Sequence, residues 1–156
     1  KGTVIAIEPD PDNQRYLRMN FSRSPNFKII PKAASDKKAK IVLYKFPESP
    51  GDSSIMYRTK DFIEVDADTI NNMCAEINIK EIDFMAIDVE GAEINVLKGA
   101  RKILRNCKEV VVGAYHKLDG KPTWFEVERL LREMGFTTFV SEDGVVHAWK
   151  PSKKTF

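Results

Sequence analysis

Residues 87–93 read Ile-Asp-Val-Glu-Gly-Ala-Glu, directly after the apolar run 84–86 and directly before a helical pattern that starts at Asn95. This order predicts a buried strand that ends in two carboxylates and then turns, at a glycine, into a helix. Ligands in open α/β sheets bind outside the carboxyl ends of the strands. We therefore expect Asp88 and Glu90 to lie at a ligand-binding edge.

A second strand, near the amino end, finishes in the same way. The apolar run 4–7 leads into Glu8, and Pro9 then breaks the strand. Two acidic strand ends in one small domain make a site for a polar ligand the first hypothesis.

Composition limits the classes of protein to consider. The chain has 156 residues, of which 42% are apolar and 31% are charged, and its net charge is +2. A chain of this size buries a core as one domain, and so small a charge indicates neither nucleic acid nor a membrane as a partner. Cys74 and Cys107 have no CxxC spacing and are interpreted as reduced thiols, with one disulfide between them as the alternative. Because no apolar stretch reaches the ~20 residues of a membrane helix and no signal peptide is visible, we expect a cytoplasmic protein.

Working outward, strands alternate with helices along most of the chain. We expect helices at 12–21, 68–77, 92–106 and 123–134, and strands at 4–7, 27–30, 39–46, 82–87, 109–115, 136–140 and 145–149. Asp12 and Thr123 are the predicted helix caps, residues 142–144 the turn of a hairpin, and 47–59 a long loop. The pattern predicts an α/β fold: a doubly wound, mostly parallel sheet with helices on both faces and a C-terminal antiparallel hairpin.

This order of elements resembles the Rossmann-like methyltransferases that depend on S-adenosylmethionine. Three stretches narrow the resemblance to the FkbM family: Ile-Ala-Ile-Glu-Pro-Asp-Pro at 5–11, Lys-Ala-Ala-Ser-Asp at 32–36, and Asp-Phe-Met-Ala-Ile-Asp-Val-Glu-Gly-Ala-Glu at 83–93 with Val-Leu-Lys-Gly-Ala at 96–100. The resemblance covers residues 4–149, and the stretch at 88–93 is its most specific part.

The resemblance implies S-adenosylmethionine as the cofactor and assigns residues to it. Glu8 would accept hydrogen bonds from the two ribose hydroxyls, since a carboxylate can take two donors. Ala34, Ser35 and Asp36 would lie beside the adenine. Asp88 would face the methyl donor, whose sulfonium cation a carboxylate attracts.

The resemblance also implies a methyl acceptor, a hydroxyl of a small molecule or sugar. Asp88 and Glu90 would face this acceptor. His116 would be the general base, because its unperturbed pKa of about 6.5 suits proton transfer near neutrality.

The sequence departs from the family pattern in two places. The Gly-rich first strand and loop of the family would precede Val4 and are not in the sequence, and Thr-Ile-Asn stands at 69–71 where the family usually shows Thr-Leu-Asp. The missing strand would lie between strands 4–7 and 82–87, and each buried unpaired backbone group costs about 1–3 kcal/mol. Either the strand was removed from a longer protein, or another chain supplies it, or the sheet closes in a new order.

We therefore expect residues 1–150 to form an N-terminally truncated Rossmann-like methyltransferase domain, followed by a basic tail at 151–156. An exposed gap in the sheet favours pairing with a second copy, so a homodimer is the expected assembly.

Each candidate also has a purely structural interpretation. Asp88 could cap the helix that follows it, and Glu93 is better explained as a first-turn helix residue than as a ligand. Asp36 could be a turn residue and His116 a packed hydrogen-bonding residue. Further candidates are aromatic residues that could line the substrate mouth or pack in the core (Tyr115, Trp124), and loop residues that could form a lid or a plain surface loop (Ser53, Ser54, Tyr57).

Two other functions stay open. Glu8, Asp10, Asp88 and Glu90 are oxygen ligands that could hold Mg²⁺ in a hydrolase, although no histidine–carboxylate spacing supports it, and we predict no metal site. A non-catalytic nucleotide-binding or assembly domain is the other alternative, since without the Gly-rich loop the carboxylate and amino groups of the cofactor lack their backbone cradle.

Overall fold

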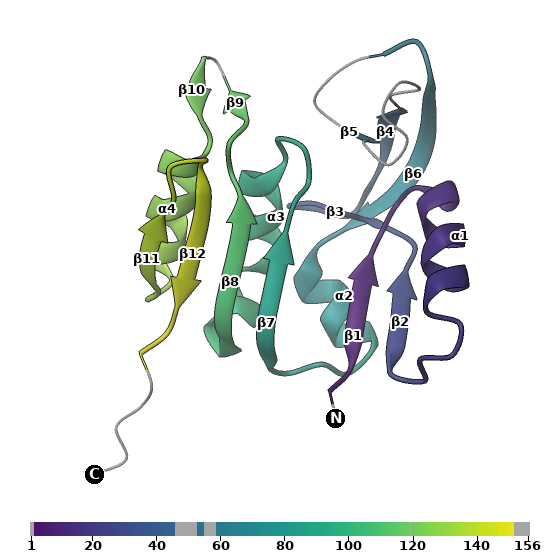
Figure 1. Cartoon of the computed structure of the whole chain (residues 1–156), viewed down its shortest axis with the longest axis horizontal. Helices are drawn as coiled ribbons and strands as arrows, with labels where there is room; N and C mark the ends of the chain where they lie inside the picture. The colour runs from purple at the N-terminus through teal and green to yellow at the C-terminus, as the bar shows by residue number, and fades with distance from the viewer. Residues whose placement is uncertain (1, 46–52, 55–58, 119, 152–156) are drawn as a thin grey trace.

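The computed structural model of the chain describes residues 2–45, 53–54, 59–118 and 120–151 (Figure 1). Its α/β character agrees with the expectation from the sequence. The predicted basic tail falls, apart from Pro151, outside the described residues, as does most of the predicted loop 47–59.

A four-stranded sheet in the order β11-β12-β8-β7 is formed by the C-terminal half of the chain. Strands β7 (Ile82–Ile87) and β8 (Cys107–Gly113) run parallel, and β12 (Val145–Trp149) and β11 (Thr137–Val140) follow as an antiparallel hairpin. The hairpin prediction is confirmed, and Gly144 in its turn has a φ of +83°, which favours glycine.

Helices α2 (Ile70–Glu76), α3 (Glu93–Ala100) and α4 (Trp124–Glu133) and the 3₁₀ helix η1 (Ile103–Asn106) contribute to one apolar core with this sheet. The core includes the inward positions predicted for residues 92–106, namely Val96, Leu97, Ala100, Ile103 and Leu104. Cys74 and Cys107 are free, as expected, and both are buried; burial raises the pKa of the Cys107 thiol to about 11.

The single helix predicted for 92–106 is wrong. It divides into α3 and η1 because the Asn71 side chain intervenes: its Oδ1 accepts the backbone N–H groups of Lys102 and Ile103, at 3.1 and 2.9 Å. The Asn71 side chain therefore caps these two donors at the start of a second, tighter helix.

A separate parallel pair begins the chain. Strand β1 (Val4–Ile7) pairs with β2 (Phe27–Ile30), and α1 (Pro11–Asn20) connects them. The predicted cap Asp12 is wrong by two residues: Asp10 is the cap, and its carboxylate accepts the Asp12 N–H at 2.8 Å. Pro11 then occupies the first helical position, where no N–H is needed.

A second four-stranded sheet, in the order β3-β6-β4-β5, projects beyond the first pair (Figure 1). It consists of β3 (Ala33–Ala34), β4 (Ala39–Lys45), β5 (Ser53–Ser54) and β6 (Phe62–Asp68). Strand β6 is missing from the expected elements, although its apolar residues 63, 65 and 67 alternate with acidic ones. A smaller hairpin, β9 (Lys117–Leu118) with β10 (Lys121–Pro122), follows β8.

The strands of the described residues do not join into one doubly wound sheet, so that part of the prediction is not confirmed. Strand β1 is hydrogen-bonded to β2 and β7 to β8, and no ladder connects β1 with β7. Closure of the sheet in a new order is therefore not observed. No helix in the described part of the chain has the length and apolar character needed to cross a membrane.

Candidate functional site

The two acidic strand ends lie at the same edge of the molecule. Strands β1, β7 and β8 point in the same direction (Figure 1), so the segments that follow them, at Glu8, Asp88 and Ala114–His116, leave from one side. This is the edge at which ligands of α/β proteins bind.

The turn from β7 into α3 has an unusual backbone. Glu90 has a φ of +50° and Gly91 a φ of +102°, so two consecutive residues are in the left-handed region. Such a conformation costs about 1–3 kcal/mol for a residue with a side chain, and it recurs at functional sites. The N-cap of α3 is Ala92, with no side-chain hydrogen bond, so Asp88 does not cap this helix.

Asp88 instead accepts a hydrogen bond from Tyr115. The Tyr115 hydroxyl lies 3.1 Å from Oδ1 and 3.3 Å from Oδ2 of the exposed Asp88 carboxylate. Burial, and then this hydrogen bond, raise the pKa of Tyr115 to about 12, so the phenol keeps its proton. Gly113 leaves room for the contact, since a Cβ there would lie 3.0 Å from the Tyr115 ring and 3.3 Å from Asp88 Oδ1.

His116 lies between two glutamates. Its Nε2 is 3.0 Å from Oε2 of Glu90, and its Nδ1 is 3.1 Å from Oε1 of Glu93. The first contact has the geometry of a hydrogen bond, whereas the second is a close approach without that alignment. The Tyr115 and His116 rings are 4.4 Å apart, so the Asp88 and Glu90 pairs form one cluster.

Glu8 is held at the other acidic strand end. Its Oε1 accepts the Asp10 N–H at 2.8 Å, and its carbonyl accepts the side chain of the buried Gln14 at 2.9 Å. Burial raises the pKa of Glu8, and the hydrogen bonds from the Asp10 backbone and the Asn13 side chain only partly oppose this.

Ala34, Ser35 and Asp36 follow one another where β3 ends. Ser35 is buried and its hydroxyl is 3.3 Å from the carboxylate of the exposed Asp36. The Ser35 carbonyl packs directly on α3, where a Cβ on Gly99 would lie 2.0 Å from it. Gly99 is therefore the residue that lets α3 approach this segment.

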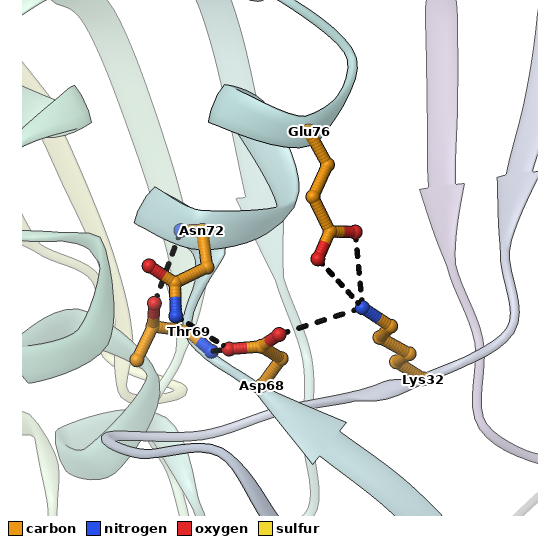
Figure 2. A network of polar contacts seen from close by, with 5 residues as sticks. All are labelled: Lys32, Asp68, Thr69, Asn72 and Glu76. Atoms are coloured by element: carbon orange, nitrogen blue, oxygen red, sulfur yellow. Dashed lines mark hydrogen bonds and ion pairs between the residues drawn. The ribbon is translucent and has the colours of Figure 1, made fainter.

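A polar network beside this segment fixes the end of β6 (Figure 2). The Ser35 N–H donates to the carbonyl of Asp68, whose buried side chain accepts from Asn72, from the Thr69 backbone and from Lys32. Burial alone would raise the pKa of Asp68, but these contacts outweigh it and lower the pKa below its usual value. Lys32 also pairs with Glu76 at 3.0 Å, which raises the pKa of the lysine.

The structure thus brings Asp88, Glu90 and His116 together, whereas Glu8 follows β1 and the 34–36 segment begins in β3, two strands that belong to different sheets. Glu93 is the residue that sequence reasoning undervalued. Its place three residues after Glu90, on the inner face of a helix with Val96 and Leu97, is the signal that predicts burial. Among aromatic candidates, Tyr115 joins the cluster, whereas Trp124 stacks on Phe125 at 3.6 Å.

The remaining surface features do not include the candidate residues. A shallow hollow on α1, lined by Arg15, Arg18, Met19 and Ser22, contains none of the candidate residues. The side chains of the predicted lid residues Ser53, Ser54 and Tyr57 fall outside the described residues. In the described part of the chain, no three His, Cys, Asp or Glu side chains are grouped to hold a metal ion.

Comparison with known proteins assigns the chain to a family. The model of the methyltransferase FkbM domain matches residues 1–138. The chain belongs to the FkbM methyltransferase domain family.

This chain is 22% identical over 142 residues to the hexuronic acid methyltransferase AglP of Haloferax volcanii. The matched region covers 91% of this chain and 58% of AglP. A crystal structure of methyltransferase FkbM from Methylobacillus flagellatus matches 94% of this chain and 36% of its own chain, with a TM-score of 0.61 and 17% identity. The second likeness supports the fold, and the FkbM domain spans little more than half of the length of AglP.

Proposed function

We propose that the FkbM domain is part of an S-adenosylmethionine-dependent methyltransferase that methylates a hydroxyl of a sugar or another small molecule. The observation that carries this proposal is the cluster of Asp88, Glu90, Tyr115 and His116 at the ligand edge of a domain of this family. The name of AglP, a hexuronic acid methyltransferase, supports a sugar acid as the acceptor class.

The residues present suit the chemistry of the cofactor. The ribose and adenine of S-adenosylmethionine offer hydroxyl and amino donors, and Glu8 and Asp36 are carboxylates, which only accept. The raised pKa of Glu8 fits a site that awaits such donors, because hydrogen bonds to a carboxylate favour its ionised form. Ala34 and Ser35 would line the adenine. When bound, the cofactor supplies an activated methyl group to an oxygen nucleophile.

The cluster can then orient the acceptor and take its proton. Asp88 accepts a hydrogen bond from the Tyr115 hydroxyl and is exposed. Its carboxylate can accept a hydrogen bond from the hydroxyl that is methylated, or attract the positive charge of the sulfonium. Glu90 and His116 form a hydrogen-bonded acid–base pair within reach of the same edge. Since methyl transfer is an in-line displacement, alignment and electrostatics are the main contributions of these residues.

Calorimetric titration of the intact protein with S-adenosylhomocysteine tests the cofactor assignment. We expect saturable binding that weakens at least about tenfold in Glu8→Ala, the loss of about 1.4 kcal/mol expected for a charge-assisted hydrogen bond. Glu109→Ala, at an exposed position of β8, is the control and should bind as the parent does. Tight binding of Mg²⁺ without the nucleoside would favour the hydrolase, and binding of neither would favour the non-catalytic domain.

A product assay tests the acceptor assignment. The intact protein, labelled methyl donor and glucuronic acid should give a product whose methyl group survives alkali, as an ether does, and Asp88→Asn should depress turnover at least about 100-fold. A base-labile product would instead place the methyl group on the carboxylate oxygen and contradict hydroxyl methylation. Unchanged turnover in Asp88→Asn would remove Asp88 from the mechanism.

A further inference from the structure

Asp68 is a buried carboxylate that the proposed reaction does not use. It ends β6 with 1% of its surface exposed, and its contacts lower the pKa of the carboxyl, so it stays ionised at neutral pH. A buried charge is costly unless it is paired and hydrogen-bonded. Oδ1 accepts the Thr69 N–H and the Asn72 side chain, both at 2.8 Å, so this oxygen holds the start of α2. The contacts of Oδ2 are therefore not needed for the helix.

Oδ2 faces the chain that leads into the expected adenine segment. Lys32 Nζ lies 3.4 Å from Oδ2, and the lysine is the residue directly before β3 (Figure 2). The main-chain carbonyl of Asp68 accepts the N–H of Ser35, the residue directly after β3, at 2.9 Å. Asp68 therefore holds β3 at both ends, through its side chain at one end and its main chain at the other.

β3 has few hydrogen bonds of its own. It is two residues long, and its ladder with β6 consists of two pairs, Ala33 with Ala67 and Ala34 with Asp68. Strands in globular proteins are usually longer than this, and so short a ladder contributes little. The position of residues 34–36 therefore depends on the contacts at the two ends of β3.

We propose that Asp68 is the positioning residue of the 34–36 segment, and that its ion pair with Lys32 keeps Ala34 and Ser35 where they would line the adenine of the cofactor. The opposite side of the segment is closed by α3, since a Cβ on Gly99 would lie 2.0 Å from the Ser35 carbonyl oxygen. A segment that is fixed before the ligand arrives loses less conformational entropy on binding. The contact with adenine rests on the proposed function, whereas the fixation of Ser35 is a property of the chain alone.

The expected effect on the reaction is on binding and not on the methyl transfer step. The 34–36 segment would contact the adenine, which takes no part in the chemistry. In Asp68→Asn, KM for S-adenosylmethionine should therefore rise at least about tenfold, while kcat stays within about threefold of the parent. A lower kcat with an unchanged KM would contradict the assignment to the adenine.

Asp68→Asn removes the ion pair selectively. The side-chain oxygen of the variant can still accept from Thr69 and Asn72, whereas its NH2 group faces the Lys32 ammonium, and two donors do not bond. Hydrogen exchange of the intact protein, followed by NMR, reports the Ser35 N–H directly. We expect its exchange to accelerate at least about tenfold, while the N–H of Val112, buried on β8, keeps the parent rate.

Titration with S-adenosylhomocysteine measures the consequence for binding. Asp68→Asn and Lys32→Met should each bind at least about tenfold more weakly, and Lys32→Arg should recover most of the affinity because its guanidinium can still donate to Oδ2. Glu76→Gln is the matched control. It alters the other partner of Lys32, whose side chain is 55% exposed and 3.0 Å away, and should bind as the parent does. Should Asp68→Asn not fold, Lys32→Met provides both measurements.

The outcomes separate this proposal from the proposed function. Unchanged Ser35 exchange in both Asp68→Asn and Lys32→Met would overturn the positioning role. Equal acceleration at Ser35 and Val112 would also overturn it, because that result indicates a general loss of stability. A parent that does not bind S-adenosylhomocysteine, with Ser35 exchange that still responds to Asp68→Asn, would refute the methyltransferase proposal and leave the positioning role standing.

Discussion

Burial of the Glu8 side chain makes its ionised form less favourable in the folded protein, and this lowers the stability of the fold at neutral pH. Desolvation raises its pKa, and the neighbouring Asp10 charge adds to the effect that backbone and Asn13 hydrogen bonds oppose. A raised folded-state pKa means that the stabilising contribution is complete below the unfolded pKa and is lost as the pH rises through the folded pKa. At neutral pH, ionised Glu8 therefore destabilises the folded protein when no ligand is bound.

Glu8→Gln resembles the protonated residue and should remove this penalty. We expect the variant to gain up to about 0.5 kcal/mol in free energy of unfolding at pH 7 and to match the parent at pH 4. Urea denaturation at both pH values measures the difference, with Glu109→Gln as an exposed control that changes neither. A variant that is less stable than the parent at pH 7 would contradict the assigned cause.

At the scale of elements, the contact between α3 and the 34–36 segment is possible because Gly99 has no side chain. A Cβ on Gly99 would lie 2.0 Å from the Ser35 carbonyl oxygen and 3.0 Å from its carbon, and both are backbone atoms. Neither can rotate away, so the helix or the segment would have to move. The Asp68 network opposes that movement, because it anchors the Ser35 N–H.

Gly99→Ala should therefore destabilise the protein although alanine favours helices by about 1 kcal/mol over glycine. We expect a net loss of about 1–3 kcal/mol from overpacking, together with weaker binding of S-adenosylhomocysteine. Thermal or urea unfolding gives the first value and calorimetry the second. Lys98→Ala, at the adjacent exposed position, should stay within about 0.5 kcal/mol of the parent.

Elements with strong periodicity could be predicted, and those that depend on distant partners could not. The apolar runs of β1 and β7 and the hairpin turn at Gly144 have local signals, which the structure confirms. The break between α3 and η1 depends on Asn71, about 30 residues earlier in the chain, and no local pattern reports it. Thr123 illustrates the same limit: it is the N-cap residue of α4, as predicted, but its hydroxyl donates to the Ala114 carbonyl and makes no cap hydrogen bond to the helix.

The site divides in the same way. Asp88 and Glu90 follow from the rule for strand ends, and the family resemblance adds His116. The Tyr115 partner of Asp88 and the Glu93 partner of His116 depend on how the end of β8 meets the β7–α3 turn, which only the packed structure shows.

At the scale of the whole molecule, β1 and β7 each have one edge that pairs with no other strand among the described residues. Each forms a parallel ladder with a single neighbour, and each carries an exposed apolar side chain, Val4 on β1 and Phe84 on β7. Open strand edges are templates for pairing with another strand. We propose that the isolated 156-residue chain pairs with a second copy through these edges.

The chain should accordingly show a mass that rises with concentration in light scattering. Phe84→Lys places a charge on the open strand and should weaken the association at least about tenfold. Phe125→Lys is the matched control, because Phe125 is 59% exposed on α4 and Phe84 is 56% exposed on β7. A monomer at every concentration, or equal effects of the two substitutions, would contradict pairing through β7.

The lack of a side chain at Gly113 has a consequence for how relatives of this chain can vary. Its backbone does not need glycine for conformational reasons, since it is not among the residues with positive φ. The atoms nearest to a Cβ at this position belong to the Tyr115 ring and the Asp88 carboxylate, and the ring is the closer of the two. Position 113 should therefore accept alanine or larger residues in those relatives where position 115 has become small, so the two positions should co-vary. Gly144 also borders Tyr115, but its φ of +83° should keep it invariant even where that coupling is released.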